Sequence, residues 1–372
     1  MKKLFVTKPF DYWIFVFAMM LISLGIVMVF SASTPYAKMK FDNIYYFLNK
    51  QLLAAGIGLI LMLAVSFIDY RLFKKVAIPA IALGFILIII VLIPGIGQIY
   101  NGSRRWIDWG PGFQPSEFFK IALIIFLSYS ISKNQEHMSK FFKGLMYHLL
   151  FLAVAALLLL REPHLSATVI ISLVTIIMLF IGGVKIYQLI ILGVIGGGGL
   201  AAFAFLTEYT NDRLTMFLDP FKDPLDLGYQ LVQSFFAIGS GGLLGRGLGK
   251  SIQKFLYMPE QHNDFIFSIL AEELGFIGCV VVIGLFFMLV YRGIRVAVQC
   301  EDTFGKLLAS GISVLFFLQA ILNIAVVTGS VPTTGISLPF FSYGGTNLVV
   351  SMFEVGILLS ISRQNIRSRS KE

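Results

Sequence analysis

The sequence alternates between long apolar stretches and short polar ones along almost its entire length. Most apolar stretches approach the about 20 residues that an α-helix needs to cross the hydrocarbon core of a bilayer. The fourth is short, and one long polar region, residues 207–263, follows the seventh. The pattern predicts an all-α polytopic membrane protein of about ten transmembrane helices, with a large loop between helices 7 and 8. The expected spans are 12–31, 46–67, 76–95, 117–131, 144–160, 166–182, 188–206, 264–291, 307–327 and 344–362.

Composition agrees with a membrane protein. Charged residues make up only 13% of the chain and hydrophobic residues 57%, whereas a soluble domain carries about 25% charged residues. The net charge of +9 does not indicate a nucleic-acid partner, because no basic stripe interleaved with aromatics lies on a soluble domain. Neither a disulfide nor a zinc site is expected from Cys279 and Cys300. The first span is too long for a cleaved signal peptide, and residues 1–372 are expected to form one integral-membrane domain.

The distribution of charge favours one orientation. With the N-terminus in the cytoplasm, most of the 29 Lys and Arg residues fall on the cytoplasmic side. This agrees with the positive-inside rule, by which short loops rich in Lys and Arg stay in the cytoplasm. Both termini are therefore expected in the cytoplasm, with a short basic tail at 363–372, and loop 207–263 is expected outside. Carboxylate chemistry is expected at the outer face, which argues against cytosolic nucleotides as substrates. The acids gathered there are Asp108, Glu117, Glu162, Asp264, Glu272 and Glu273.

The most informative of these acids is Asp264, which ends the run Glu260-Gln261-His262-Asn263-Asp264 at the mouth of the eighth span. A carboxylate at the membrane boundary is costly and marks a candidate functional site. Ser268 and Glu272 follow on the same helix face, Glu272 about 12 Å deeper, which indicates a polar cavity. The alternative is that Asp264 only caps the helix, since Asp is a favoured N-cap residue.

A second polar segment, residues 104–109, precedes the fourth span. Its tryptophans are either interfacial anchors or part of a site with its arginines, which bind phosphates well. Pro115 and Ser116 suit a helix start, so Glu117 and Lys120 share one face of that helix. They form either a functional pair or a structural ion pair. Between the fifth and sixth spans, Glu162 is either a cap or a site residue, and His164 is a weaker candidate.

Glycine- and proline-rich segments complete the outer side. Residues 228–242 are apolar but too short to span, which predicts an interfacial or re-entrant segment. Residues 245–251 are not a phosphate-binding loop, because Leu244 occupies the position of the leading glycine. The cations of this loop could nevertheless reach lipid diphosphates. Residues 332–346 predict a broken backbone, which is tolerated at membrane depth beside protein or a water-filled cavity. The loop cations that could reach lipid diphosphates are Arg246, Lys250 and Lys254.

These segments, in this order, resemble the SEDS family of bacterial cell-wall proteins (shape, elongation, division and sporulation). Residues 11–13, 25–33 and 253–260 are more similar to its FtsW and SpoVE types than to its RodA type. One departure is Pro163-His164 where many members have Pro-Asp. The matching strings are NGSRRWI at 101–107, FQPSE at 113–117, EP at 162–163, QS at 233–234, AIGSGG at 237–242, PEQHNDFIF at 259–267, AEELG at 271–275 and LPFFSYGG at 338–345.

The resemblance implies a multi-pass protein of the bacterial cytoplasmic membrane that polymerises lipid II into glycan for cell division, cell shape or sporulation. It implies an essential Asp264, important Glu117 and Lys120, and a loop glutamine, Gln233. The implied partners are undecaprenyl-linked glycan, a class B penicillin-binding protein, and membrane proteins of the divisome or elongasome.

For this reaction we expect Asp264 to act as the base toward a sugar hydroxyl, with His262 orienting it. Lys120 is expected to stabilise the departing diphosphate, and Glu117 to position Lys120 or a metal. A divalent cation could assist, although no ligand set indicates one. The alternative activity is a lipid II flippase, which would also use broken helices and buried acids; a scaffold would leave the acids unexplained. The expected substrate-binding residues are Arg105, Gln233, His262, Arg246, Lys250, Ser342 and Tyr343.

Overall fold

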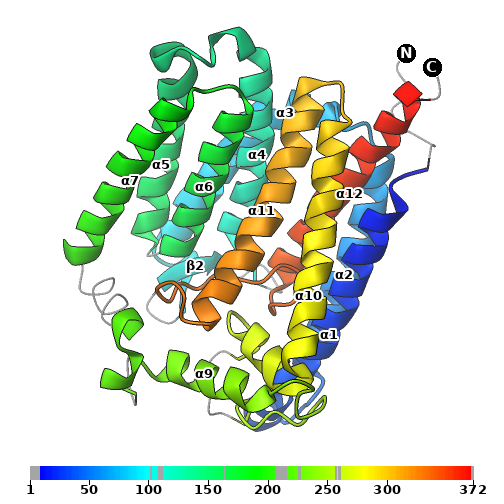
Figure 1. The fold of residues 1–372 in the computed structure, drawn as a ribbon, viewed down its shortest axis with the longest axis vertical. Helices are drawn as coiled ribbons and strands as arrows, with labels where there is room; N and C mark the ends of the chain where they lie inside the picture. The colour runs from blue at the N-terminus through cyan, green and yellow to red at the C-terminus, as the bar shows by residue number, and fades with distance from the viewer. Residues whose placement is uncertain are drawn as a thin grey trace.

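The computed structural model describes residues 9–100, 103–107, 112–162, 164–206, 216–224, 228–255, 258 and 261–369. Expectations for Asp108, Trp109, Pro163 and Glu260 lie outside this range. The fold is a bundle of long, roughly parallel helices (Figure 1). Its long helices are α1 (Tyr12–Phe41), α2 (Tyr46–Phe67), α3 (Leu72–Leu92), α4 (Pro115–Lys133), α5 (Tyr147–Arg161), α6 (Leu165–Ile181), α7 (Ile186–Leu206), α10 (Ile266–Val298), α11 (Thr303–Val327) and α12 (Gly345–Arg369).

A helix lies at each of the ten predicted spans, and the chain is a multi-pass membrane protein. Among the described segments, eight helices are long and apolar enough to cross a bilayer. The other two, α6 and the Ile186–Gly199 part of α7, are apolar but shorter, so the count of ten spans stays a prediction. Large apolar side chains such as Leu53, Ile60 and Val194 are exposed on the bundle surface, as expected for a surface that faces lipid.

Helix α4 lies inside the bundle and organises its packing. Of the residues in its apolar 18-residue stretch, 83% are buried, which is the highest share among the eight helices long and apolar enough to span. It packs against α3 and α11, while α2 lies along α12 and α10 along α11. The large buried side chains Phe119, Phe304 and Phe316 fill the space between these helices. This packing places the first turn of α4, with its two charged residues, in the protein interior.

One end of the bundle carries the connections that were expected outside, and we call it the loop end. It holds the antiparallel hairpin β1 (Gly97–Tyr100) and β2 (Ser103–Ile107), which the sequence pattern did not predict. It also holds α9 (Tyr229–Gly241), which lies across the end of the bundle (Figure 1) and covers most of residues 228–242, whose interfacial or re-entrant position stays a prediction. Residues 328–344, which we call the broken segment, contain no helix or strand, as predicted. The start of α1 and the last turns of α12 lie together at the opposite end (Figure 1), where the Asp11 amide donates to Ser362 Oγ at 3.0 Å.

Three short helices complete the described structure. A 3-10 helix (Gln135–His137) and a π-helix (Phe141–Met146) connect α4 to α5, and a 3-10 helix (Pro220–Lys222) precedes α9. Several boundaries differ from prediction, for example the end of α1 and both ends of α10. Helix α1 continues ten residues beyond its expected end to Phe41, and α10 begins two residues later than expected and contains a break at Gly275, whose φ is 66°.

Candidate functional site at the loop end

Asp264 lies just before α10, and its neighbours hold it from two sides. The side-chain amide of Asn323, on α11, donates to the Asp264 carbonyl oxygen at 2.7 Å and to the Ile336 carbonyl oxygen at 2.6 Å. A Cβ built on Gly335 would lie 2.8 Å from Asp264 Oδ2, so the carboxylate lies against this glycine. The N-cap of α10 is Phe265. The Asp264 carboxylate faces the broken segment, and the helix-capping alternative for Asp264 stays a prediction.

The broken segment follows a fixed path beside Asp264. Phe340 has a φ of 66°, which is unusual for a residue other than glycine. Ser342 Oγ accepts a hydrogen bond from the Leu338 amide at 2.7 Å, so this hydroxyl, expected to bind substrate, shapes the turn. The Tyr343 amide donates to the His262 carbonyl oxygen at 2.8 Å. These contacts attach the broken segment to the residues that lead into Asp264.

His262 is packed among aromatic rings. Its ring centroid lies 4.6 Å from that of Phe47, 5.5 Å from that of Tyr36 and 5.6 Å from that of Tyr343. Burial lowers the pKa of His262 to about 4, and the positive charge of Lys40 acts in the same direction. A neutral ring in an aromatic cluster holds the backbone before Asp264. The proposed orientation of the Asp264 carboxylate by this ring stays a prediction.

Glu117 and Lys120 form a buried ion pair in the first turn of α4. Lys120 Nζ lies 2.8 Å from Glu117 Oε2, and the two side chains are 5% and 7% exposed. A third ionisable residue, the buried Glu354 on α12, interacts electrostatically with both. Sequence reasoning missed Glu354, although an ionisable residue inside an apolar span is itself a signal of function. The pair is thus one part of a larger buried ionic group.

Arg105, Glu162 and His164 extend this group. Arg105 Nε donates to the Glu162 carbonyl oxygen at 3.4 Å, and Glu162 Oε2 lies 4.0 Å from His164 Nδ1. Burial raises the pKa of Glu162 to about 8, partly offset by the charge of Arg105. Burial also lowers the pKa of His164 well below its usual value, with further contributions from Arg105 and Lys120. Near pH 7 Glu162 is therefore mostly protonated and His164 neutral.

Hydrogen bonds join the residues just before α4 to the first turn of α12, which directly follows the broken segment. Thr346 Oγ1 donates to the Gly112 carbonyl oxygen at 3.0 Å and accepts from the Gln114 amide at 3.3 Å. The residues around Asp264 and the ionic group of α4 therefore belong to one connected region at the loop end.

The remaining candidates lie on α9 and on the loop that follows it. Gln233 is half-buried on α9, and the next side chain, Ser234, is hydrogen-bonded to α10 through Ser268 at 2.7 Å. Lys250 is exposed, whereas Arg246 Nε lies 3.7 Å from a buried oxygen of Glu272.

Glu272 lies in a buried polar environment rather than against lipid, and the expected polar cavity stays a prediction. Its carboxylate is occupied by the loop after α9, because it accepts hydrogen bonds from Ser251 Oγ and from the Ile252 amide. Within the described ranges, no group of three or more His, Cys, Asp or Glu residues could hold a metal ion.

The fold and the site define a class: a multi-pass α-helical membrane protein whose buried ionic residues gather at one end of the bundle, beside a broken segment. Residues 11–367 match the family of cell cycle proteins named after FtsW, RodA and SpoVE. The chain belongs to this family.

Relatives that align with almost the full length of the chain support this family assignment. The chain is 44% identical to a probable peptidoglycan glycosyltransferase FtsW of Geobacter sp. (strain M18), covering 95% of this chain and 97% of that one. It is 42% identical to the stage V sporulation protein E of Bacillus subtilis (strain 168), covering 96% and 98%.

Solved structures show the same fold. One is a chain from a study of how a peptidoglycan synthase complex coordinates polymerisation and crosslinking, with a TM-score of 0.79, 28% identity and coverage of 96% of this chain and 98% of that chain. Another is the rod shape determining protein RodA of Thermus thermophilus, with a TM-score of 0.68, 26% identity and coverage of 96% and 97%.

Proposed function

We propose that this protein is a peptidoglycan glycosyltransferase that polymerises lipid II at the outer face of the cytoplasmic membrane. The observation that carries the proposal is the placement of Asp264, whose carboxylate lies against Gly335 at the same end of the bundle as the buried Lys120–Glu117 pair. The relatives named as peptidoglycan glycosyltransferases support the same activity.

In this proposal the loop end faces outward and both termini lie in the cytoplasm. The support is the concentration of Lys and Arg in the short connections at the other end, which the positive-inside rule assigns to the cytoplasm. Lipid II presents its sugars at the outer surface, where Asp264 and the ionic group of α4 would meet them.

The reaction forms one glycosidic bond and breaks one bond to phosphate. The C4 hydroxyl of one lipid II attacks the anomeric carbon of the growing glycan, and undecaprenyl diphosphate leaves with the electrons of the broken C–O bond. Asp264 accepts the hydroxyl proton as general base, a role that contributes typically about 10²–10⁴-fold to a rate. The position just before α10, fixed by Asn323 through its backbone, suits a base that must hold one geometry.

Positive charge must balance the departing diphosphate. The buried Lys120 and the half-buried Arg105 are the proposed source, because a cation shielded from water stabilises developing negative charge more strongly than an exposed one. Glu117 holds Lys120 in place through their ion pair. Gln233 and Tyr343 are proposed to contact the sugar or the glycan, and Arg246 and Lys250 to attract the diphosphate from the loop.

A class B penicillin-binding protein is the proposed partner, which would crosslink the glycan as it forms. The support is the structural similarity to the chain from the peptidoglycan synthase complex. The partner would bind within the membrane and at the loop end, beside the site of polymerisation.

The experiment uses the full chain, purified in detergent and supplied with labelled lipid II, alone and with a class B penicillin-binding protein. We expect glycan polymers on a gel. A parallel assay in vesicles measures transfer of labelled lipid II across the bilayer. Polymerisation without transfer supports the proposal, whereas transfer without polymerisation would establish the flippase alternative.

A further inference from the structure

Two consecutive glutamates, Glu272 and Glu273, anchor the loop after α9 to α10. Glu272 accepts a hydrogen bond from the Ile252 amide at 2.9 Å and one from Ser251 Oγ. Glu273 accepts from the Ser251 amide at 3.3 Å. Both carboxylates are buried. The loop is therefore held to α10 by buried polar contacts, whose loss would leave charge uncompensated in the interior.

Glu273 also belongs to a three-residue cluster that we call the latch: Ser31 of α1, Lys254 of the loop and Glu273 of α10. Lys254 Nζ donates to Glu273 Oε1 at 2.9 Å and to Ser31 Oγ at 3.2 Å, and Ser31 Oγ lies 2.7 Å from both Glu273 oxygens. The Lys254 side chain is 5% exposed and that of Glu273 0%. Lys254 is thus a buried structural cation, in contrast to the expectation that it meets lipid diphosphates.

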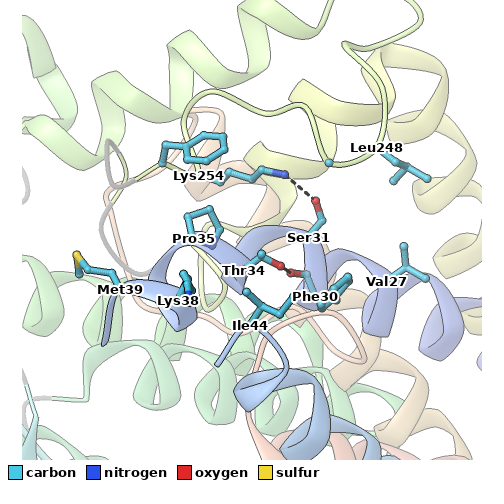
Figure 2. Close-up of a pocket in the computed structure, with 12 residues that line it drawn as sticks. Val27, Phe30, Ser31, Thr34, Pro35, Lys38, Met39, Ile44, Leu248 and Lys254 are labelled. Atoms are coloured by element: carbon cyan, nitrogen blue, oxygen red, sulfur yellow. Dashed lines mark hydrogen bonds between the residues drawn. The ribbon is translucent and has the colours of Figure 1, made fainter. Parts of the chain in front are cut away.

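The latch holds the loop across a gap rather than across packed side chains. A pocket of about 770 Å³ separates α1 from the loop, lined by Phe30, Pro35, Leu248 and Phe255 together with two latch residues. Figure 2 shows Lys254 reaching from the loop to Ser31 on α1 beside this pocket. Because side chains do not fill this pocket, the latch supplies a buried polar connection between α1 and the loop beside it, in addition to the contact of Gln261 with Ala32.

The latch lies at one end of a short helical unit and Asp264 at the other. Helix α10 is interrupted at Gly275, so its first part, residues 266–274, runs as a separate piece from Asp264 to the latch. The loop returns to the same place, since Gln261 Nε2 donates to the Lys254 carbonyl oxygen at 3.0 Å and to the Ala32 carbonyl oxygen at 3.3 Å. Asp264 follows Gln261 by three residues.

We propose that Lys254 is a positioning residue for Asp264: through the latch it fixes the first part of α10 and the loop against α1, and so sets the place of the Asp264 carboxylate. This inference rests on the proposed function, in which Asp264 is the base. A displacement of about 1 Å at a reacting group can lower a rate by about 100-fold. Loss of the latch should therefore reduce turnover and leave the binding of lipid II intact.

The test uses the purified full chain and four variants. Lys254→Met removes the charge and keeps the length, Lys254→Arg keeps the charge, and Lys254→Met with Glu273→Gln removes both charges of the pair. Lys222→Met is the matched control, because Lys222 is exposed at the same end of the bundle. The measurements are kcat for glycan formation, affinity for labelled lipid II, thermal stability, and hydrogen–deuterium exchange of residues 246–264.

The proposal expects Lys254→Met to lower kcat at least tenfold, with lipid II affinity within twofold and faster exchange in 246–264. Lys254→Arg should keep at least half the wild-type kcat, and the double variant should exceed Lys254→Met at least threefold, because it leaves no unpaired buried charge. Lys222→Met should match the wild type in every measurement.

Three results would overturn the proposal: a kcat of Lys254→Met within twofold of wild type, a parallel loss of kcat and lipid II affinity, or a double variant no better than Lys254→Met. If Lys254→Met does not fold, the double variant decides, because it should fold, bind lipid II with affinity within twofold of wild type, and turn over at least threefold more slowly than wild type; a wild-type kcat would overturn the proposal. If the wild type makes no glycan, the proposed function has failed, and exchange alone then tests the latch. Unchanged exchange in Lys254→Met would overturn it.

Discussion

Replacement of Gly25 by alanine tests how closely the broken segment must approach α1. A Cβ at Gly25 would lie 2.1 Å from the Phe340 carbonyl oxygen, whereas an ordinary C···O contact is about 3.3–3.6 Å. The backbone of the broken segment must therefore move by about 1 Å. Overpacking of this kind destabilises the folded protein by about 1–3 kcal/mol. The higher helix propensity of alanine relative to glycine stabilises it by about 1 kcal/mol. We expect a net destabilisation of up to about 2 kcal/mol.

The effect of Gly25→Ala on activity should exceed its effect on stability. The broken segment contacts the Asp264 carboxylate through Gly335, so a shift of about 1 Å there should lower polymerisation by about 10- to 100-fold. Thermal unfolding in detergent and glycan formation from lipid II measure the two effects. Gly56→Ala is the control, because a Cβ at Gly56 meets nothing within 4 Å. If Gly25→Ala and Gly56→Ala behave alike in both assays, the close approach has no role.

Three further predictions concern residues around the site. Lys120→Met should destabilise the protein by about 3–5 kcal/mol in denaturant unfolding, because it leaves the buried Glu117 carboxylate unpaired, and Lys120→Met with Glu117→Gln should cost less; equal losses would contradict this. Asn323→Leu should cost about 1–3 kcal/mol and slow polymerisation, since its amide holds the Asp264 carbonyl; unchanged polymerisation would contradict this. His262, with its pKa lowered to about 4 from 6.5, contributes stability above pH 6.5 that is lost as pH falls toward 4. His262→Phe should remove that part of the acid destabilisation, of about 3 kcal/mol, in melting curves between pH 4 and 7; an unchanged pH dependence would contradict it.

Much of the fold could be predicted from the apolar pattern, because the length and hydropathy of a span report directly on the bilayer. Helices lie at all ten expected positions, and the prolines and glycines after α11 correctly predicted the broken segment. The spacing of Glu117 and Lys120 also predicted a pair on one helix face, which the structure places as a buried ion pair.

The errors have identifiable physical causes. Hydropathy marks the part of a helix inside the membrane, so the polar end of α1, which continues to Phe41, was not counted. The strands of the hairpin are only four and five residues long and carry no clear alternation.

Contacts between distant segments could not be read from the sequence either. The face of α10 predicted a cavity at Glu272, and no local pattern shows that a loop about 20 residues earlier contacts this carboxylate. The same loop, folded back onto α10, brings Lys254 within 2.9 Å of Glu273.

The most direct test of the central claim is glycan formation from lipid II by purified Asp264→Asn, compared with wild type in the presence of the same class B penicillin-binding protein. The substitution keeps the size of the side chain and removes the proposed base. We predict loss of polymerisation by at least 100-fold, with unfolding temperature and lipid II affinity unchanged. Polymerisation by Asp264→Asn at the wild-type rate would contradict the account.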